Sequence, residues 1–507
     1  MTRALGVDIG TTNVKVALVE ADGTPVATAS RPLAFTLAGD TAEQDTEAVW
    51  RTLGDAIEEV TAGQDGIDTV GVCSQYSSIV PIDANARPVA PMLMWQDLRG
   101  TDHSFEILAR HEQAFMTFVD RHGIPPIGSG LSLGHILHYQ LDRPDVHAQT
   151  AAYVEAMDAV TARLTGRITA NQHTSFMVQC CDNRTLGATQ YDDDLVQLSG
   201  VDATRLPELV RVDEAIDTVL PEIGDALGLA RGATVYAGTN DTATVAVGTG
   251  AFRPGRAGLA IGTTSVLVDE VAGFRVDLEH QILSMPGPYP DRYIVCAENG
   301  LGGKVLEHML HNVVFAADEL ADHSSATPFA KLDDALRATG PGAGGVLFLP
   351  WLRGASAPQS SSAMRGGFVH MSLDTTRRDL VRAVCEGVAH NLRALLPHVE
   401  AFSGEPIEEI AFVGGAARSA AWCQVLADVL DRPIVALAQP DGAVARATAL
   451  LALERAGALT RADLDQEPRS GSTTYEPDPQ SRSLYADRHV QFEAAYAALL
   501  PISEALG

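Results

Sequence analysis

Positive charge is scarce in this sequence, and lysine is the scarcest source of it. The 507 residues include 36 lysines and arginines against 65 aspartates and glutamates, for a formal net charge of −29. The lysines are Lys15, Lys304 and Lys331. So acidic a chain disfavours nucleic acid and anionic membranes as partners. It does not exclude an anionic small molecule, because glycine-rich backbone and a divalent cation can bind one locally.

The sequence also lacks cysteine motifs of the CxxC type and long hydrophobic runs. The six cysteines show no CxxC spacing, and no apolar run approaches the roughly 20 residues that span a bilayer. The N-terminus has neither the basic nor the apolar part of a signal peptide. We therefore expect a reduced, cytoplasmic protein without membrane contact. Its length and its 46% hydrophobic content predict two or three globular domains.

The first motif is a strand, a tight polar turn and a second strand. Leu5, Val7 and Ile9 alternate as in a buried strand, Asp8 lies near its end, and a second strand begins at Val14. A glycine followed by hydroxyl residues lets backbone N–H groups approach an anion, and a neighbouring carboxylate can hold its metal ion. We interpret the motif as a phosphate-binding hairpin with a Mg²⁺ carboxylate; the alternative is an ordinary hairpin with a buried aspartate. The turn residues are Gly10, Thr11, Thr12 and Asn13.

A similar pattern recurs near the middle of the chain. Residues 258–268 read GLAIGTTSVLV, which again places a glycine and two threonines between strands. The preceding segment from Arg253 to Gly258 is the best linker candidate, so we expect domains at 1–252 and 253–507. Two similar domains would each bring a hairpin to phosphates in the cleft between them. Chance likeness of two β-turns is the alternative.

Strands and helices alternate along the chain, which predicts an α/β architecture. Helices are expected at Thr46–Val60, Tyr153–Gly166 and Leu373–Leu396. Asp241 would begin a helix at the carboxyl end of a strand, where open α/β sheets place ligands, although a simple helix cap is equally compatible with the sequence.

Two further segments combine polar residues with turns. Residues 92–100 read MLMWQDLRG, in which an aromatic ring and carboxylates resemble the wall of a polyol site; an exposed loop with an internal Asp–Arg pair is the alternative. Residues 414–419 read GGAARS between a strand and a helix, and could cradle an adenosine or a phosphate or form a plain capped turn.

Taken in order, these motifs resemble the FGGY carbohydrate kinases, most closely the xylulokinase-like branch. The resemblance rests on DIGTT, WQDLR, GTNDTA, IGTTS and GGAARS and covers about residues 4–500. It implies two actin-like, ribonuclease H-like ATPase domains with an interdomain cleft that binds ATP, Mg²⁺ and a sugar or polyol. A homodimer is one expected assembly.

The resemblance also implies roles for individual residues. Asp241 would be the catalytic base, and Asp8 and Asp241 would face the metal ion. The nucleotide contacts would come from Gly10, Thr11, Thr12, Asn13, Lys15, Gly262, Thr263, Gly414, Gly415 and Ser419. The substrate contacts would come from Gln75, Tyr76, Ser77, Trp95, Asp97, Asp241 and Thr242.

Three departures from the family pattern bear on the substrate. Tyr76 and Ser77 replace a Met-His pair, Thr242 replaces an Asn or Gln, and residues 354–358 lack the usual Glu and Arg. The expected reaction is ATP-dependent phosphorylation of a sugar or polyol hydroxyl. A ketopentose such as xylulose is favoured, with glycerol, ribulose, erythritol or gluconate as alternatives within the family. An actin-like ATP-binding regulator without kinase activity is the alternative from another class.

Overall fold

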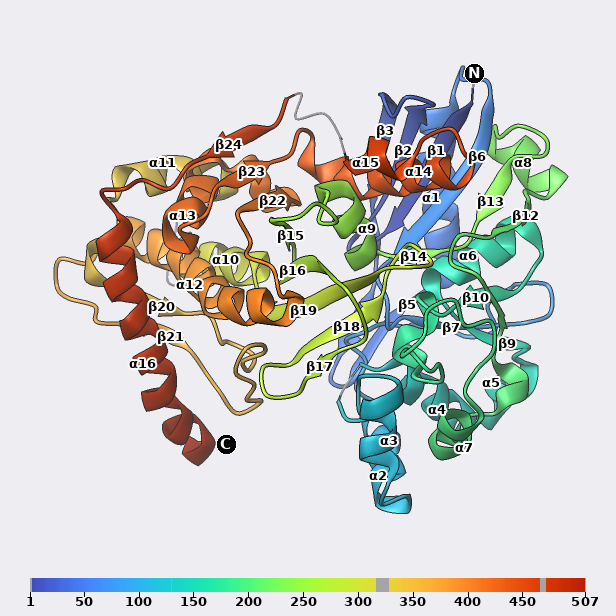
Figure 1. Ribbon diagram of the computed structural model, residues 1–507, viewed down its shortest axis with the longest axis horizontal. Coiled ribbons are helices and arrows are strands. Elements are labelled where there is room, and N and C mark those ends of the chain that lie inside the picture. Colours follow the sequence, from blue (N-terminus) through green and yellow to red (C-terminus); the bar gives the residue numbers. More distant parts are fainter. Residues whose placement is uncertain (1, 129, 316–327, 466–470, 507) are drawn as a thin grey trace.

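The computed structural model describes residues 2–128, 130–315, 328–465 and 471–506 (Figure 1). They form two lobes, each built on its own sheet. This two-lobed α/β arrangement is the predicted fold class.

The first sheet has seven strands, and its centre is the predicted hairpin. β1 pairs with β2 antiparallel and with β6 parallel. Leu5, Val7 and Ile9 of β1 point into a core shared with helix α1. In order across the sheet, the strands are β12 (Ala215–Thr218), β13 (Thr234–Tyr236), β6 (Ile67–Ser74), β1 (Arg3–Ile9), β2 (Asn13–Glu20) and β3 (Pro25–Pro32), with β14 (Thr239–Asn240) also on β6.

Helices and a second, smaller sheet complete the first lobe. Helix α1 begins after Asp45, whose side chain accepts hydrogen bonds from Glu47 N and Ala48 N. The smaller sheet comprises β4 (Thr36–Ala38), β5 (Thr41–Gln44), β8 (Met92–Leu93), β7 (Ile79–Ile82) and β9 (Ala152–Glu155). The helices are α1 (Thr46–Thr61), α2 (Thr101–Arg110), α3 (Ala114–Arg121), α4 (Ser132–Asp142), α5 (Pro144–Gln149), α6 (Ala156–Thr165), α7 (Asp193–Ser199) and α8 (Pro221–Leu227). A short parallel pair joins β10 (Thr169–Asn171) to β11 (Glu208–Val210).

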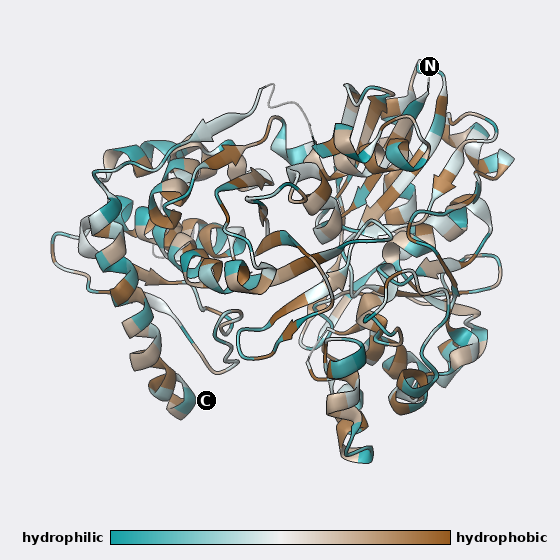
Figure 2. Ribbon diagram, in the orientation of Figure 1, coloured by the Kyte–Doolittle hydropathy of each residue, from teal (hydrophilic) through white to brown (hydrophobic). Residues whose placement is uncertain are grey.

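The second sheet has eight strands and contains the second hairpin. Figure 2 shows hydrophobic residues along its strands β18 and β19, and many of them are buried. Across the sheet, the strands are β17 (Val276–Asp277), β18 (Ile282–Pro286), β19 (Tyr293–Leu301), β16 (Thr264–Val271), β15 (Arg256–Ile261), β22 (Glu409–Val413), β23 (Ile434–Ala436) and β24 (Thr473–Tyr475). The remaining elements are α10 (Gly303–Met309), α11 (Leu332–Ala338), α12 (Arg377–Ser403), α13 (Ala420–Leu430), α15 (Arg461–Asp465), α16 (Arg482–Leu506), and the strand pair β20 (Leu347–Leu349) and β21 (Gly367–Val369).

Two helices lie between the main sheets. α9 (Asp241–Thr249) contacts β15 and β16, and α14 (Ala443–Arg455) contacts β1, β2, β6 and α9. The close approach of α14 requires glycine: a Cβ on Gly6 would lie 2.0 Å from the Ala445 carbonyl oxygen, and one on Gly71 would lie 2.7 Å from the Thr448 oxygen. The middle layer thus joins the lobes by direct backbone packing.

The structure modifies several expected boundaries. The helix predicted from Tyr153 begins at Ala156, because residues 152–155 instead pair with β7 as strand β9. The helix predicted from Leu373 begins after Thr376, which forms a capping box with Asp379. β15 begins at Arg256, inside the expected linker.

The two main sheets fall on either side of residue 253, but α14 from the second half packs on the first sheet. The domain division at 252 and 253 therefore stays a prediction. Within the described residues, no helix combines the length and hydrophobicity needed to cross a bilayer.

Candidate functional site

The first hairpin brings a carboxylate and an ammonium group together. In the antiparallel register Asp8 lies opposite Lys15, and Lys15 Nζ is 3.8 Å from Asp8 Oδ2. The turn is closed by Gly10 N, which donates to Asn13 O at 3.0 Å. Thr12 at its tip is exposed. The tip of the turn is therefore accessible from solvent, as an anion site requires.

Asp8 and Asp241 come from distant parts of the chain but lie near one another. Asp8 is in register with Cys73 of β6, and Cys73 is in register with Thr239 of β14. Two strand spacings amount to roughly 10 Å between backbones. Asp241 follows two residues after Thr239 and begins α9. The two carboxylates therefore converge at the carboxyl edge of the first sheet.

The helix cap next to Asp241 leaves its carboxylate available. Asn240 is the cap, and its side chain accepts from Ala243 N. Asp241 Oδ1 accepts from the neighbouring Thr242 N at 2.8 Å. The alternative interpretation of Asp241 as the cap is therefore wrong, and the side chain is open to a second role.

Burial and mutual repulsion change the acidity of both carboxyl groups. Desolvation, followed by the negative charge of Asp8, raises the pKa of Asp241 to about 7. Desolvation also raises the pKa of Asp8, while the Lys15 ammonium opposes that rise. A carboxylate with a pKa near neutrality is suited to accept a proton during a reaction.

The second hairpin and the Gly-Gly turn meet at the edge of the second sheet. Gly262 N donates to Thr264 O, and Gly302 N donates to Thr263 O. β15 and β22 are parallel neighbours, so the turns that follow them lie side by side. A Cβ on Gly414, whose φ is +93°, would lie 3.0 Å from Ile261 O. The predicted nucleotide residues Gly262, Thr263 and Gly414 are thus brought together.

Gly415 and Ser419 continue the Gly-Gly turn. Gly415 is exposed, and Ser419 caps α13 by accepting from Trp422 N. The Ser419 hydroxyl also donates to Asp333. These contacts match the capped-turn alternative and leave the nucleotide role of Ser419 as a prediction.

A partly buried hydrogen-bond network joins the turn of the first hairpin to Gln44, Gln75 and Trp95. Thr11 Oγ1 donates to Gln75 Oε1 at 2.7 Å and accepts from Trp95 Nε1 at 3.2 Å. Gln44 Nε2 donates to Thr11 O at 2.9 Å, and Gln75 Nε2 donates to Gln44 Oε1. The network thus joins the turn of the first hairpin to Gln75 and Trp95, two of the residues predicted to contact the substrate. Gln44 belongs to no sequence motif and was missed by sequence reasoning.

Asp97 orders the loop that carries Trp95. Its carboxylate is fully buried, accepts from Ala42 N and pairs with Arg99, which also binds Glu43. Burial alone would raise the pKa of the Asp97 carboxyl group, but hydrogen bonds from Arg99 and Ala42 N lower it below its ordinary value. Asp97 is fully buried and holds this loop in place, and its expected contact with a sugar stays a prediction.

Tyr76 reaches from the first lobe to the second. Its hydroxyl lies 3.7 Å from Cys296 Sγ of β19. Ser77 is buried in a left-handed backbone conformation with φ of 55°, and Thr242 is buried beside Asp241. Glu298, two positions beyond Cys296, is exposed. Sequence reasoning missed Cys296 and Glu298, since they lie in an ordinary strand.

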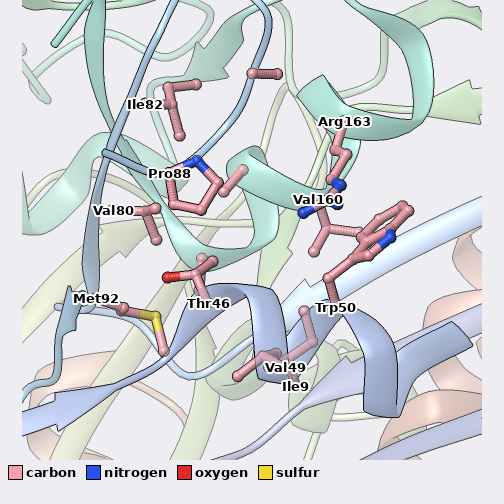
Figure 3. A pocket seen from close by; sticks show the side chains of 13 residues that line it. Ile9, Thr46, Val49, Trp50, Val80, Ile82, Pro88, Met92, Val160 and Arg163 are labelled. Atoms are coloured by element: carbon pink, nitrogen blue, oxygen red, sulfur yellow. The ribbon is translucent and has the colours of Figure 1, made fainter. Parts of the chain in front are cut away.

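A separate apolar pocket lies on the other face of the first sheet (Figure 3). Ile9 lines it, whereas the adjacent Asp8 faces the opposite side, as alternation along a strand requires. Val49, Val80 and Met92 form much of its wall (Figure 3), and the Arg163 guanidinium lies over the Trp50 ring. The pocket lacks the convergent polar groups that a hydroxylated ligand needs.

The carboxylates fit a hard divalent cation. Burial is the main cause of the raised pKa of Asp241, and repulsion from the negative charge of Asp8 adds to it. Carboxylate oxygens are the ligands that Mg²⁺ prefers, and a cation between them would relieve this repulsion. The residues present are therefore compatible with Mg²⁺.

Comparisons with known proteins cover nearly the whole chain. The N-terminal and C-terminal domains of the "FGGY family of carbohydrate kinases" match residues 3–248 and 260–455. A xylulose kinase of Escherichia coli (strain K12) is 26% identical, with 98% of this chain and 99% of that protein covered. A gluconokinase of Bacillus subtilis (strain 168) is 24% identical, with 85% and 83% covered. The crystal structure titled a "xyloylose kinase" from Brucella ovis superposes with a TM-score of 0.84 at 25% identity, with 99% and 100% covered.

Proposed function

This chain belongs to the FGGY family of carbohydrate kinases, and from that premise we propose that it transfers a phosphoryl group from ATP to a hydroxyl of a ketopentose such as xylulose, with Asp241 as the base. The observation that carries the residue assignment is the convergence of Asp8 and Asp241 at one sheet edge. The pKa of Asp241, raised to about 7, supports its role.

Asp241 performs the proton chemistry in this proposal. It orients the acceptor hydroxyl and takes its proton as the oxygen attacks the phosphoryl group. General-base assistance of this kind is worth about 10²–10⁴ in rate. The bond from Thr242 N holds one carboxylate oxygen in place, and the other oxygen is left for the acceptor.

The two hairpin turns bind the phosphates. Gly10 to Asn13 contribute from the first lobe, and Gly262 and Thr263 contribute from the second, beside Gly414 and Gly415. Backbone N–H groups and hydroxyls in both turns stabilise negative charge that develops on the transferring group. Mg²⁺, held on the Asp8 and Asp241 side, supplies charge neutralisation when it is bound. Lys15 adds a positive charge beside Asp8.

The acceptor binds against the wall formed by Trp95, Gln75 and Tyr76. The Thr11 network fixes the first two side chains, and Tyr76 closes the wall toward the second lobe. Relatives named xylulose kinase in Escherichia coli and Streptomyces coelicolor, at 26% and 27% identity, support a ketopentose acceptor. Gluconate is a second candidate, because the Bacillus subtilis relative named gluconokinase is nearly as similar, at 24% identity.

Two further parts of the proposal concern the state of the protein. The six cysteines are unpaired, and five of them are buried, which supports a reducing, cytoplasmic location. The homodimer rests on the family resemblance, and light scattering of the purified protein tests it.

The experiment for the function is a panel of acceptors. ADP release is measured with Mg²⁺–ATP and each of xylulose, ribulose, glycerol, erythritol and gluconate, and the phosphorylated product is identified by ³¹P NMR. The proposal expects acceptor-dependent ADP release with a sugar phosphate as product. ATP turnover that is independent of every acceptor would contradict it and favour an ATP-binding regulator.

A further inference from the structure

Strand β19 has one face in the core and one face toward the first lobe. Val295 and Ala297 are fully buried in the core of the second lobe. Asn299 continues that face, and its side chain donates to Ala357 O and Asn391 O. Because side chains alternate along a strand, Cys296 and Glu298 point the other way.

The second face of β19 is turned toward the first lobe. Cys296 on this face contacts the Tyr76 hydroxyl of the first lobe at 3.7 Å. Glu298 lies next along the same face and pairs across the strands with Val266, two residues after Thr264 of the second hairpin. Along β19, Glu298 therefore lies between Cys296, which contacts Tyr76, and the end of the strand that pairs with the second hairpin at Thr264.

Glu298 is accessible to solvent and is also partly desolvated by its neighbours. Its side chain is exposed to solvent, yet partial desolvation by neighbouring groups raises its pKa. Desolvation by burial is the main cause of the raised pKa of Tyr76 and of Cys296, and the negative charges of Glu298 and Asp241 both add to the rise. Both carboxyl groups therefore influence the contact between Tyr76 and Cys296, which joins the two lobes.

The charged groups of the candidate site are mostly negative. Asp8, Asp241 and Glu298 contribute carboxyl groups, and the Lys15 ammonium lies beside Asp8. An acceptor that carries its own carboxylate would meet repulsion here, since like charges brought together in a partly desolvated site are disfavoured.

We propose that Glu298 is an acceptor-binding residue supplied by the second lobe, and that it selects uncharged polyhydroxy acceptors over sugar acids. This inference rests on the proposed kinase function. A carboxylate has two acceptor oxygens and binds hydroxyl donors on neighbouring carbons of a sugar or polyol. The same group repels the carboxylate of an aldonate, so one residue provides both attraction and rejection.

The test compares wild type with Glu298→Gln on xylulose and on gluconate. Wild type is expected to favour xylulose in kcat/KM. The glutamine variant keeps the side-chain size but loses the charge, so the KM for xylulose should rise about 10-fold or more, as for loss of a hydrogen bond to a charged group. The ratio of kcat/KM for gluconate to that for xylulose should rise by a similar factor. The KM for ATP should not change.

Glu279→Gln is the matched control, because Glu279 is an exposed carboxylate of the same lobe away from β19. It should leave both acceptor constants unchanged. ADP affinity measured by calorimetry reports whether each variant is folded.

Wild-type preference for gluconate, or an unchanged acceptor ratio in Glu298→Gln with normal ADP affinity, would overturn this inference alone. Failure of the wild type to phosphorylate any acceptor would instead overturn the proposed function, and this inference with it.

Discussion

Asp8 and Lys15 face each other across the first hairpin, with Lys15 Nζ 3.8 Å from Asp8 Oδ2. The eight residues 8–15 thus bring a carboxylate, a glycine-threonine turn and an ammonium group into one unit. Asp241 lies close enough for the charge of Asp8 to raise its pKa. Lys15 partly offsets this effect, so the three groups form one electrostatic system.

Removal of the Lys15 charge should shift the pH profile of the enzyme. Lys15 lowers the pKa of both Asp8 and Asp241. In Lys15→Met the pKa of Asp241 therefore rises, and the base becomes active only at higher pH. The acid limb of kcat/KM against pH, expected near pH 7 in wild type, should move upward by as much as about one pH unit. Lys331→Met is the control, because Lys331 is remote from the hairpin, and it should leave the pH profile unchanged. If the acid limb stays at the same pH in both variants, Lys15 does not influence the pKa of the catalytic base.

The indole N–H of Trp95 should contribute to acceptor binding through Thr11. Trp95→Phe keeps an aromatic ring but removes the donor to Thr11 Oγ1. Loss of one such hydrogen bond costs about 0.5–1.5 kcal/mol, so the KM of the acceptor should rise roughly 3- to 10-fold while the KM of ATP stays constant.

Trp50→Phe is the matched control for this substitution. Trp50 lines the apolar pocket of Figure 3, on the other face of the sheet, beneath Arg163. Its replacement should leave the KM of the acceptor unchanged. Equal effects of the two substitutions in steady-state kinetics would argue against a role for the network.

The packing of α14 on the first sheet predicts a large effect of one methyl group. In Gly6→Ala the new Cβ would lie 2.0 Å from Ala445 O, so helix and strand must separate. Overpacking of this kind costs about 1–3 kcal/mol or more, and the urea midpoint of unfolding should fall. Gly273→Ala, which meets no atom within 4 Å, should unfold at the wild-type midpoint. Equal midpoints for both variants would mean that α14 does not pack closely here.

Local signals explain what the sequence could predict. Gly10, Thr11 and Thr12 mark a turn by their own chemistry, and the alternation around Asp8 marks a strand. The same signals recur at Gly262 and Thr263. The position of Asp241 at the start of a helix also followed from the local pattern.

Contacts between distant segments explain what the sequence could not predict. Residues 152–155 continue the helical pattern that follows them, and only pairing with β7 makes them a strand. Gln44 bonds to the first hairpin through Thr11 O, and Glu298, which we propose for the site, lies on a strand whose partners are distant in sequence. Asp97 is expected at the sugar, and in the structure Arg99, two residues away, bonds to its oxygens.

The most direct test of the account is the turnover of Asp241→Asn with Mg²⁺–ATP and the acceptor that the wild type prefers. The asparagine oxygen can still accept from Thr242 N, so the local structure should persist. Loss of the base should reduce kcat by about 10²–10⁴, with ADP affinity unchanged by calorimetry. Turnover at the wild-type rate would contradict the assignment of Asp241 and, with it, the catalytic centre described here.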